Sequence, residues 1–187
     1  MKLGAQYGYW TREPKLDIVS VALEAENLGY DSLWTGESYS SDAFTPLCWV
    51  GAHTSKIKLA TGIAQLGART PATLAMQAMT LDTLSGGRFC LGIGVSGPQV
   101  IEGWHGQPFG KPIARTKETI NIIRKILLRD EPVTADGPNL PLPYPKDAPN
   151  SWGLGKPLKL ISKPLRPDIP IYLGAEGPKN IALAFEE

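Results

Sequence analysis

The chain has 187 residues, of which 42% are hydrophobic and 20% charged, and its formal net charge is +1. These values are typical of one globular domain with a real core. The small net charge excludes a general electrostatic attraction to nucleic acid or anionic lipid. No apolar run reaches the roughly 20 residues that cross a bilayer. Because the N-terminus also has no signal-peptide core, we expect a cytoplasmic protein with neither a nucleic-acid nor a membrane partner.

The first elements alternate between two hydrophobic periods. In chain order we predict a strand at 3–7, a helix at 18–28 after Pro14, a strand at 32–35, a helix at 42–53 and a strand at 57–61. The apolar residues of the first helix recur at helical spacing, and Gly29 ends it. Asp42 is the expected N-cap of the second helix.

The next helix begins at Thr70-Pro71, with Thr at the N-cap and Pro at the first helical position, and ends at Gly86-Gly87. The end of this helix spells LSGGR, which is close to the signature loop of ABC-type ATPases. In this chain the stretch ends a helix and leads into a strand at 88–93, and no properly spaced phosphate-binding loop accompanies it. The sequence therefore argues against an ATPase.

Gly92 to Gly97 reads G-x-G-x-x-G, which is the fingerprint of dinucleotide-binding folds. That fingerprint belongs in the first strand–helix turn, whereas here it follows the fourth strand. Pro98 and the turn-rich residues 103–106 delay the next clear helix to 113–129. We interpret Gly92 and Gly94 as small residues that let another group approach the end of the strand.

The last third is rich in proline. Residues 131–168 are predicted to form a long loop, with a small hairpin whose arms are 133–135 and 139–140. A fifth strand at 169–174 and a helix from Gly177-Pro178 to Glu187 follow. Five strand–helix units indicate an α/β fold with a parallel sheet, either doubly wound or barrel-shaped.

Several ordered motifs resemble the bacterial luciferase-like superfamily. They are TGIAQ at 61–65, ARTP at 68–71, TLD-LSGGRF at 80–89, GVSGPQV at 94–100, EGWHG at 102–106 and LGAEGPK at 173–179. The last three are similar to the branch that uses the deazaflavin coenzyme F420. The resemblance implies a TIM (β/α)8-type barrel, of which residues 1–187 would be one truncated, N-terminal domain with about five strand–helix units. A complete barrel usually needs about 250 residues.

The resemblance also implies a cofactor site at the C-terminal ends of the strands. In the superfamily the third strand ends in a non-proline cis peptide that supports the flavin or deazaflavin ring, and this falls on Gly62 and Ile63. The resemblance places further cofactor contacts in the loops after the fourth and fifth strands. The implied contact residues of these loops are Gly94, Ser96 and Gly97, then Gly174, Ala175 and Gly177.

The implied reaction is hydride transfer between the deazaflavin and a small organic substrate. Some relatives that oxidise sugar phosphates carry an Asp-His pair at this place, in which the histidine acts as the acid–base group. Glu37 stands at this place here and is the candidate acid–base residue. No histidine accompanies it, which argues against that particular dehydrogenase. His53 and His105 are expected to be structural, and Trp34, Trp49, Trp104 and Trp152 to belong to the core.

Two alternatives stay open. The first is an FMN-dependent monooxygenase of the same superfamily, and the second is an inactive or partner-dependent half-barrel. A complete barrel could form a homodimer. The thiols of Cys48 and Cys90 lack metal-ligand spacing, so we expect them to be buried and expect no metal site.

Overall fold

The structure is a computed structural model that describes residues 1–13 and 17–186. Its strands are β1 (Gly4–Gly8), β2 (Ser32–Thr35), β3 (Lys58–Thr61), β4 (Ala64–Gln65), β5 (Phe89–Gly94) and β6 (Ile171–Leu173). Its helices are α1 (Ile18–Asn27), α2 (Thr45–His53), α3 (Pro71–Leu84), α4 (Pro98–Gly103), α5 (Pro112–Leu128) and α6 (Pro178–Glu186). All predicted strands and helices occur among the described residues, and β4 and α4 are additional. The predicted end of the last helix at Glu187 lies outside the described residues.

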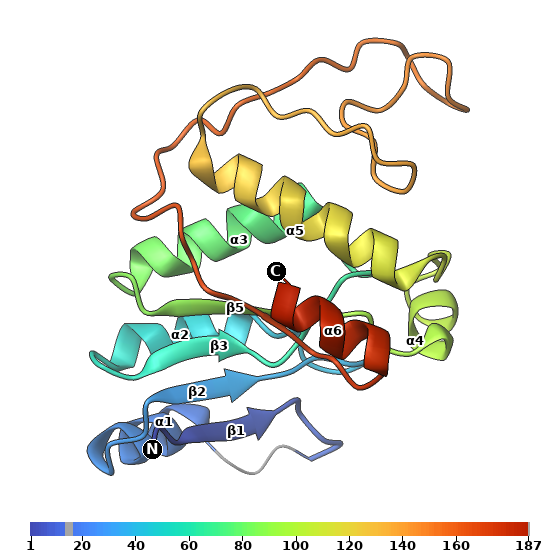
Figure 1. The fold of residues 1–187 in the computed structure, drawn as a ribbon. Coiled ribbons are helices and arrows are strands. Elements are labelled where there is room, and N and C mark those ends of the chain that lie inside the picture. Colours follow the sequence, from blue (N-terminus) through green and yellow to red (C-terminus); the bar gives the residue numbers. More distant parts are fainter. Residues whose placement is uncertain (14–16, 187) are drawn as a thin grey trace.

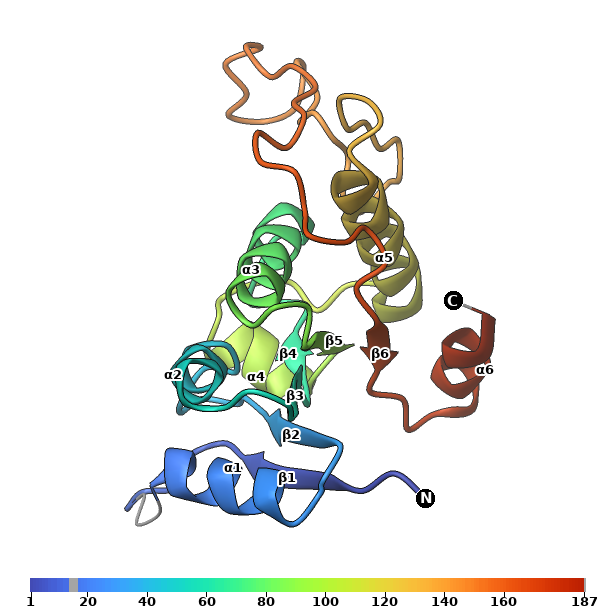
Figure 2. The same cartoon turned by 90° about the vertical axis from the view of Figure 1, so that its left-hand side faces the viewer.

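The six strands form one parallel sheet. β1 pairs with β2, β2 with β3, and β3 with the start of β5. β4 continues along the same edge of β5, and β6 pairs with the other edge. Viewed nearly end-on, the strands follow an arc from β1 to β6, with α1, α2, α3 and α5 around its outer side (Figure 2). The predicted parallel α/β sheet is confirmed, and its curvature is that of a barrel wall.

The core lies between the outer face of this sheet and the helices. Leu33, Leu59 and Leu91 occupy neighbouring strands and are fully buried against the helical layer. α5 contributes the predicted stripe of Ile120, Ile123 and Leu127, which is also buried. α3 and α5 pack side by side over β5 (Figure 1). This helical layer leaves the C-terminal ends of the strands accessible to a ligand.

Capping fixes where the helices begin. The Thr70 hydroxyl accepts a hydrogen bond from the Thr73 N–H, as predicted for α3. Helix α2 begins at Thr45, three residues later than expected, and its N-cap is Phe44 rather than the predicted Asp42. The Asp42 carboxylate nevertheless accepts from the N–H groups of Phe44 and Thr45. Burial raises the pKa of Asp42, but these bonds together with the nearby Arg69 lower it overall.

The predicted helix stop after α3 is confirmed. Gly86 and Gly87 have φ of 67° and 84°, a left-handed conformation that favours glycine. The buried Asp82 carboxylate accepts from the Phe89 N–H at the start of β5 and from the Arg166 guanidinium. Arg166 also donates to the Phe89 carbonyl at 2.8 Å. These contacts bind the end of α3, the start of β5 and the returning long segment together.

Two predictions about the second half are corrected. A helix does follow the glycine fingerprint directly: α4 has Gly97 as its N-cap and Pro98 at its first turn. It is only six residues long, which is why helical periodicity does not reveal it. The predicted hairpin is also different, because Ala135 pairs with Leu142, and Val133 with the distant Leu158.

The arm expected at 139–140 is instead held by α5. The Glu118 carboxylate accepts hydrogen bonds from the N–H groups of Asn139 and Leu140 and from the Asn139 amide. Residues 131–168 otherwise form an extended segment that projects from the helical layer (Figure 1). The long loop predicted at 131–168 therefore has this tether to α5 in addition to the two bridges.

The burial predicted from residue type is wrong for several side chains. Trp49, Trp104 and Trp152 are exposed rather than buried, with Trp152 90% exposed. Cys48 is exposed as well, because it lies on the outer side of α2, whereas Cys90 is buried as predicted. Among the described residues no helix is long and apolar enough to cross a membrane.

Candidate cofactor site at the strand ends

The chain crosses the strand ends at residues 62–63, between β3 and β4. The Gly62-Ile63 peptide bond is cis, as the resemblance implied. The Ile63 side chain then lies against two glycines of other strands. A Cβ atom at Gly94 would be 3.0 Å from Ile63 Cγ1, and one at Gly174 would be 3.0 Å from Ile63 Cγ2. Four of the predicted cofactor residues are thus brought together around one apolar side chain.

Glycine is required at two further places beneath this crossing. A Cβ atom at Gly92 would be 1.8 Å from the Thr61 carbonyl oxygen, and one at Gly36 would be 2.8 Å from the Gly62 carbonyl oxygen. The Thr61 hydroxyl donates to the Gly92 carbonyl and accepts from its N–H. The chain's own backbone therefore fills the room beside both glycines, with the Thr61 carbonyl against Gly92 of β5 and the Gly62 carbonyl against Gly36 after β2. We call this backbone at 61–62 the ledge.

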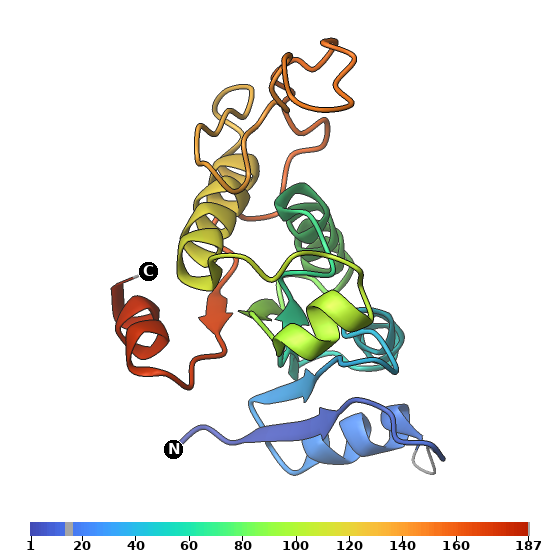
Figure 3. The same ribbon diagram turned by 90° about the vertical axis from the view of Figure 1, so that its right-hand side faces the viewer.

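The other predicted contacts lie in the loops after β5 and β6, which are neighbouring strands. Ser96 has φ of 59°, and Gly97 then caps α4, which lies across the strand ends in Figure 3. Ala175 and Gly177 lead into α6, and a Cβ atom at Gly177 would meet nothing within 4 Å. We call the ledge, with Ile63 and these two loops, the cradle. Of the cradle glycines only Gly177 has open space beside it, because Ile63 lies against Gly94 and Gly174 and the Gln99 side chain against Gly97.

Glu37 lies in the loop after β2, and its carboxylate is almost fully occupied. Arg69 grips both oxygens, with Nη2–Oε2 at 2.8 Å and a short Nη1–Oε1 contact. Oε1 also accepts from the Gln65 N–H at 2.6 Å, and Oε2 from the Ala43 N–H at 3.0 Å. The Arg69 guanidinium lies over the Phe44 ring. Each carboxylate oxygen of Glu37 therefore accepts two hydrogen bonds from protein donors.

Gln65 and Arg69 are functional-site candidates that residue types alone did not indicate. Gln65 is buried in β4, beside Gly94, and its amide nitrogen donates to the carbonyls of Glu37 and Ser38. Its amide oxygen contacts His105 Nε2 at 2.9 Å. Gln65 ends the TGIAQ motif and Arg69 lies in the ARTP motif, so the motifs could have indicated both residues. The hydrogen bonds that join these two residues to Glu37 could not be predicted from the motifs.

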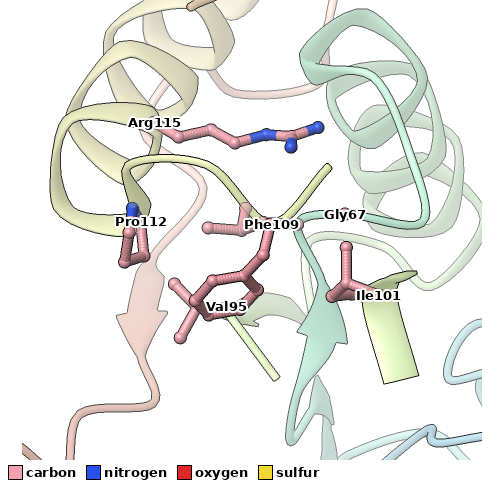
Figure 4. A pocket seen from close by; sticks show the side chains of 7 residues that line it. Gly67, Val95, Ile101, Phe109, Pro112 and Arg115 are labelled. Carbon is pink, nitrogen blue, oxygen red and sulfur yellow. The ribbon is translucent and has the colours of Figure 1, made fainter. Parts of the chain in front are cut away.

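Two pockets formed by the described residues lie beside or away from the cradle, although the first shares Val95 with the loop after β5. A water-sized pocket beside it is lined by Val95, Ile101, Phe109 and Pro112, with the Arg115 side chain lying across it (Figure 4). A much larger apolar groove of about 500 Å³ lies between α3, α5 and the long segment, away from the strand ends. We give the cradle precedence because ligands of parallel α/β sheets bind at the C-terminal ends of the strands. The described residues hold no cluster of His, Cys, Asp and Glu suited to a metal ion.

The curved parallel sheet with helices on its outer side is that of a class of barrel enzymes. The model of the luciferase-like monooxygenase family matches residues 4–187. The chain belongs to this family.

Its relatives are about twice as long. A Mycobacterium tuberculosis protein named for coenzyme F420-dependent oxidoreductase activity is 54% identical over 186 residues, which are 100% of this chain and 53% of that protein. The 5,10-methylenetetrahydromethanopterin reductase of Methanolobus tindarius is 34% identical, over 93% of this chain and 48% of its own.

A solved structure gives the same picture. The coenzyme F420-dependent tetrahydromethanopterin reductase of Methanopyrus kandleri matches with a TM-score of 0.78 at 25% identity, over 100% of this chain and 53% of its own. The chain therefore spans about half the length of the relatives it matches, and its sheet is the corresponding part of a TIM-type barrel.

Proposed function

We propose that this chain is the N-terminal part of a coenzyme F420-dependent oxidoreductase that transfers hydride between the deazaflavin and a small organic substrate. The observation that carries the proposal is the cradle: Ile63 lies between Gly94 and Gly174 on a glycine-lined ledge at the strand ends. The F420-related names of the 54% identical relative and of the solved structure support the choice of coenzyme. The half-barrel belongs to one domain, with 131–168 as its long loop.

The cradle fits a planar, anionic coenzyme. When bound, the deazaflavin supplies a ring carbon that accepts or releases hydride. Ile63 and the ledge at Gly62 would support that ring. The loop at 174–177 would turn backbone N–H groups at the start of α6 toward the anionic parts, and Ser96-Gly97 would line the other side of the site. The chain's contribution is to orient the ring and exclude water from it.

Glu37 has two competing roles. Its predicted acid–base role stays a prediction, and we propose a positioning role instead. A carboxylate that accepts two hydrogen bonds on each oxygen, two of the four from one guanidinium, has no free position for a substrate proton. By holding Ala43, Gln65 and Arg69 together, Glu37 would fix the loop after β2 beside the cradle.

The alternatives are an FMN-dependent monooxygenase and a half-barrel that acts only with a partner. A homodimer of the complete barrel and a cytoplasmic location are further proposals. The deciding experiment is a fluorescence titration of the 187-residue chain with coenzyme F420 and, separately, with FMN. Saturable binding of F420 alone is the expected result. Binding of FMN alone would move the function to the monooxygenase, and binding of neither would favour the partner-dependent half-barrel.

A pair of substitutions at one position locates the site. Gly97 is the N-cap of α4, where both Asp and Asn are favourable. A Cβ atom there would lie 2.6 Å from the flexible end of the Gln99 side chain, which has to move equally in both variants. Gly97→Asp adds a negative charge that repels an anionic coenzyme, and we expect its affinity to fall at least about tenfold. Gly97→Asn matches the size without the charge and should bind more tightly than Gly97→Asp. Equal affinities in the wild type and Gly97→Asp would remove this loop from the site.

A further inference from the structure

His105 follows α4 and is linked to the cradle through Gln65, which pairs with Gly94. Its hydrogen bond to Gln65 reveals which ring nitrogen carries a hydrogen. The Gln65 amide lies 3.1 Å from the Glu37 carbonyl and 3.2 Å from the Ser38 carbonyl through Nε2. Carbonyl oxygens only accept, so the group between them must be the NH2. The other amide atom is then the oxygen, and it can only accept from His105 Nε2, 2.9 Å away. Nε2 of His105 therefore carries a hydrogen.

This fixes the neutral tautomer. When Nε2 carries the hydrogen, the lone pair of the imidazole is on Nδ1. Among the described residues no hydrogen bond to Nδ1 of His105 occurs. The bond to Gln65 survives protonation of the ring, because both ring nitrogens of an imidazolium are donors. Proton uptake at Nδ1 thus leaves the contact that orients the ring intact.

The surroundings hold the ring in place. The His105 N–H donates to the Val100 carbonyl of α4, and the Trp104 ring beside it packs against Tyr39 from the loop after β2. Gln65 pairs in register with Gly94, one of the two glycines against Ile63. The charged groups behind Gln65 are Glu37 and Arg69, which neutralise one another. His105 is therefore an oriented, half-buried base at the rim of the cradle.

We propose that His105 handles the proton that accompanies hydride transfer, with Nδ1 directed at the ligand and Gln65 as its positioning residue. In the oxidative direction a substrate C–H bond breaks and its electron pair leaves with the hydrogen as hydride to the deazaflavin. The substrate heteroatom–H bond breaks as the new double bond forms, and that proton passes to Nδ1. The reductive direction returns it. This inference rests on the proposed function.

The second histidine provides an internal control. His53 is exposed on the outer side of α2, where its Nδ1 contacts the Trp49 carbonyl at 2.8 Å. A neutral His53 should therefore carry its hydrogen on Nδ1, the opposite tautomer from His105, since that carbonyl only accepts. His105→Gln is a matched variant: its amide can still donate to Gln65 but offers no titrating nitrogen.

The test has two parts on the full chain. Long-range 1H–15N spectra of the 15N-labelled protein, assigned with His53→Gln, should show His105 as the Nε2–H tautomer. Calorimetric titration with coenzyme F420 near pH 7, in buffers of different ionisation enthalpy, counts the protons taken up on binding. We expect fractional uptake in the wild type and in His53→Gln, because the anionic coenzyme favours the imidazolium, and its loss in His105→Gln.

Each outcome decides the matter. An Nδ1–H tautomer for His105 would overturn the assignment even without coenzyme. Equal proton uptake in the wild type and His105→Gln, with F420 bound in both, would overturn the role of His105 and leave the proposed function standing. Absence of F420 binding in the wild type would overturn the proposed function and the role of His105 with it, while the spectra still report the tautomer.

Discussion

Each end of the sheet has an ion pair between an arginine and a nearly buried carboxylate, and the two ion pairs connect different segments of the chain. At the C-terminal end Arg69 grips Glu37, and at the N-terminal end Arg166 grips Asp82. Both carboxylates are almost fully buried, with side-chain exposures of 5% and 2%. Both also accept backbone N–H groups, so each ion pair organises chain segments that are distant in sequence.

The difference lies in what is organised. Asp82 joins a helix end, a strand start and the returning long segment, none of which approaches the cradle. Glu37 joins the loop after β2 to β4, and through Gln65 to His105. In barrel enzymes the C-terminal face carries the chemistry and the opposite face carries stability. Both ion pairs are therefore structural, and we expect only the pair at the C-terminal end to influence ligand binding.

Removing one partner of each pair should give the largest effect. Glu37→Gln and Asp82→Asn both leave a partly buried guanidinium without its anion, with Arg69 13% and Arg166 29% exposed. Because solvent screens the unpaired charge, we expect a loss of about 3 kcal/mol of unfolding free energy for Glu37→Gln and a smaller one for Asp82→Asn. Urea unfolding measures this loss. F420 affinity, measured well below the unfolding midpoint, should fall in Glu37→Gln and not in Asp82→Asn.

The matching surface pair supplies the control. Lys58 and Asp31 lie 3.1 Å apart with side chains 42% and 30% exposed, so Asp31→Asn should cost less than about 1 kcal/mol. If Asp82→Asn weakened the coenzyme as much as Glu37→Gln did, the two ends of the sheet would not be functionally distinct.

Substitutions of Gly92 in β5 and of Gly87 just before it test the same difference between the two ends of the sheet, with smaller expected effects. Gly92→Ala would place Cβ 1.8 Å from the Thr61 oxygen and force the ledge to move, at about 1 to 3 kcal/mol. Gly87→Ala has room but retains φ of 84°, which costs about 1 to 2 kcal/mol. We expect weaker F420 binding only for Gly92→Ala, by fluorescence titration. Unchanged binding there would show that the ledge does not support the ring.

The smallest effect concerns acid stability at the N-terminal end. Burial raises the pKa of Glu26, but hydrogen bonds from the backbone N–H groups of Ile57, Lys56 and Ser55 outweigh it and lower the pKa below the ordinary 4.5. Its contribution is therefore present above the ordinary carboxyl pKa and is lost as the pH falls through the lowered value.

Urea midpoints near pH 7 and near pH 3 test this expectation. The wild type should lose more stability than Glu26→Gln between the two conditions, because the variant has no carboxylate to protonate. F420 affinity near pH 7 should be the same in both proteins. An identical acid sensitivity would assign it to other carboxylates, with Asp42 as the next candidate.

Much of this fold is predictable because local signals and burial agree. Thr70-Pro71 and Gly86-Gly87 mark both ends of α3 by capping chemistry and left-handed geometry, which depend on few neighbours. The glycines of β5 were correctly interpreted as places of close approach, although the approaching group could not be known. The cis bond at Gly62-Ile63 came from the family resemblance and not from residue types.

The parts that were missed depend on contacts between distant residues. α4 is too short for a period to be visible, and the hairpin arm was displaced by Glu118 of α5. The exposed Trp49 and Trp152 show that a large aromatic side chain does not by itself indicate the core. The role of Glu37 changes once Arg69 is seen beside it, and no spacing rule joins these two residues.

One consequence follows from the strand order. β1 and β6 terminate the described sheet, and each presents a row of backbone donors and acceptors on its outer side. A barrel has no such margins, since every strand has two neighbours. A polypeptide that closes the barrel therefore has to pair with β1 and with β6 at the same time. An open edge strand can pair with a strand of another molecule, so we expect self-association of the chain to increase with its concentration.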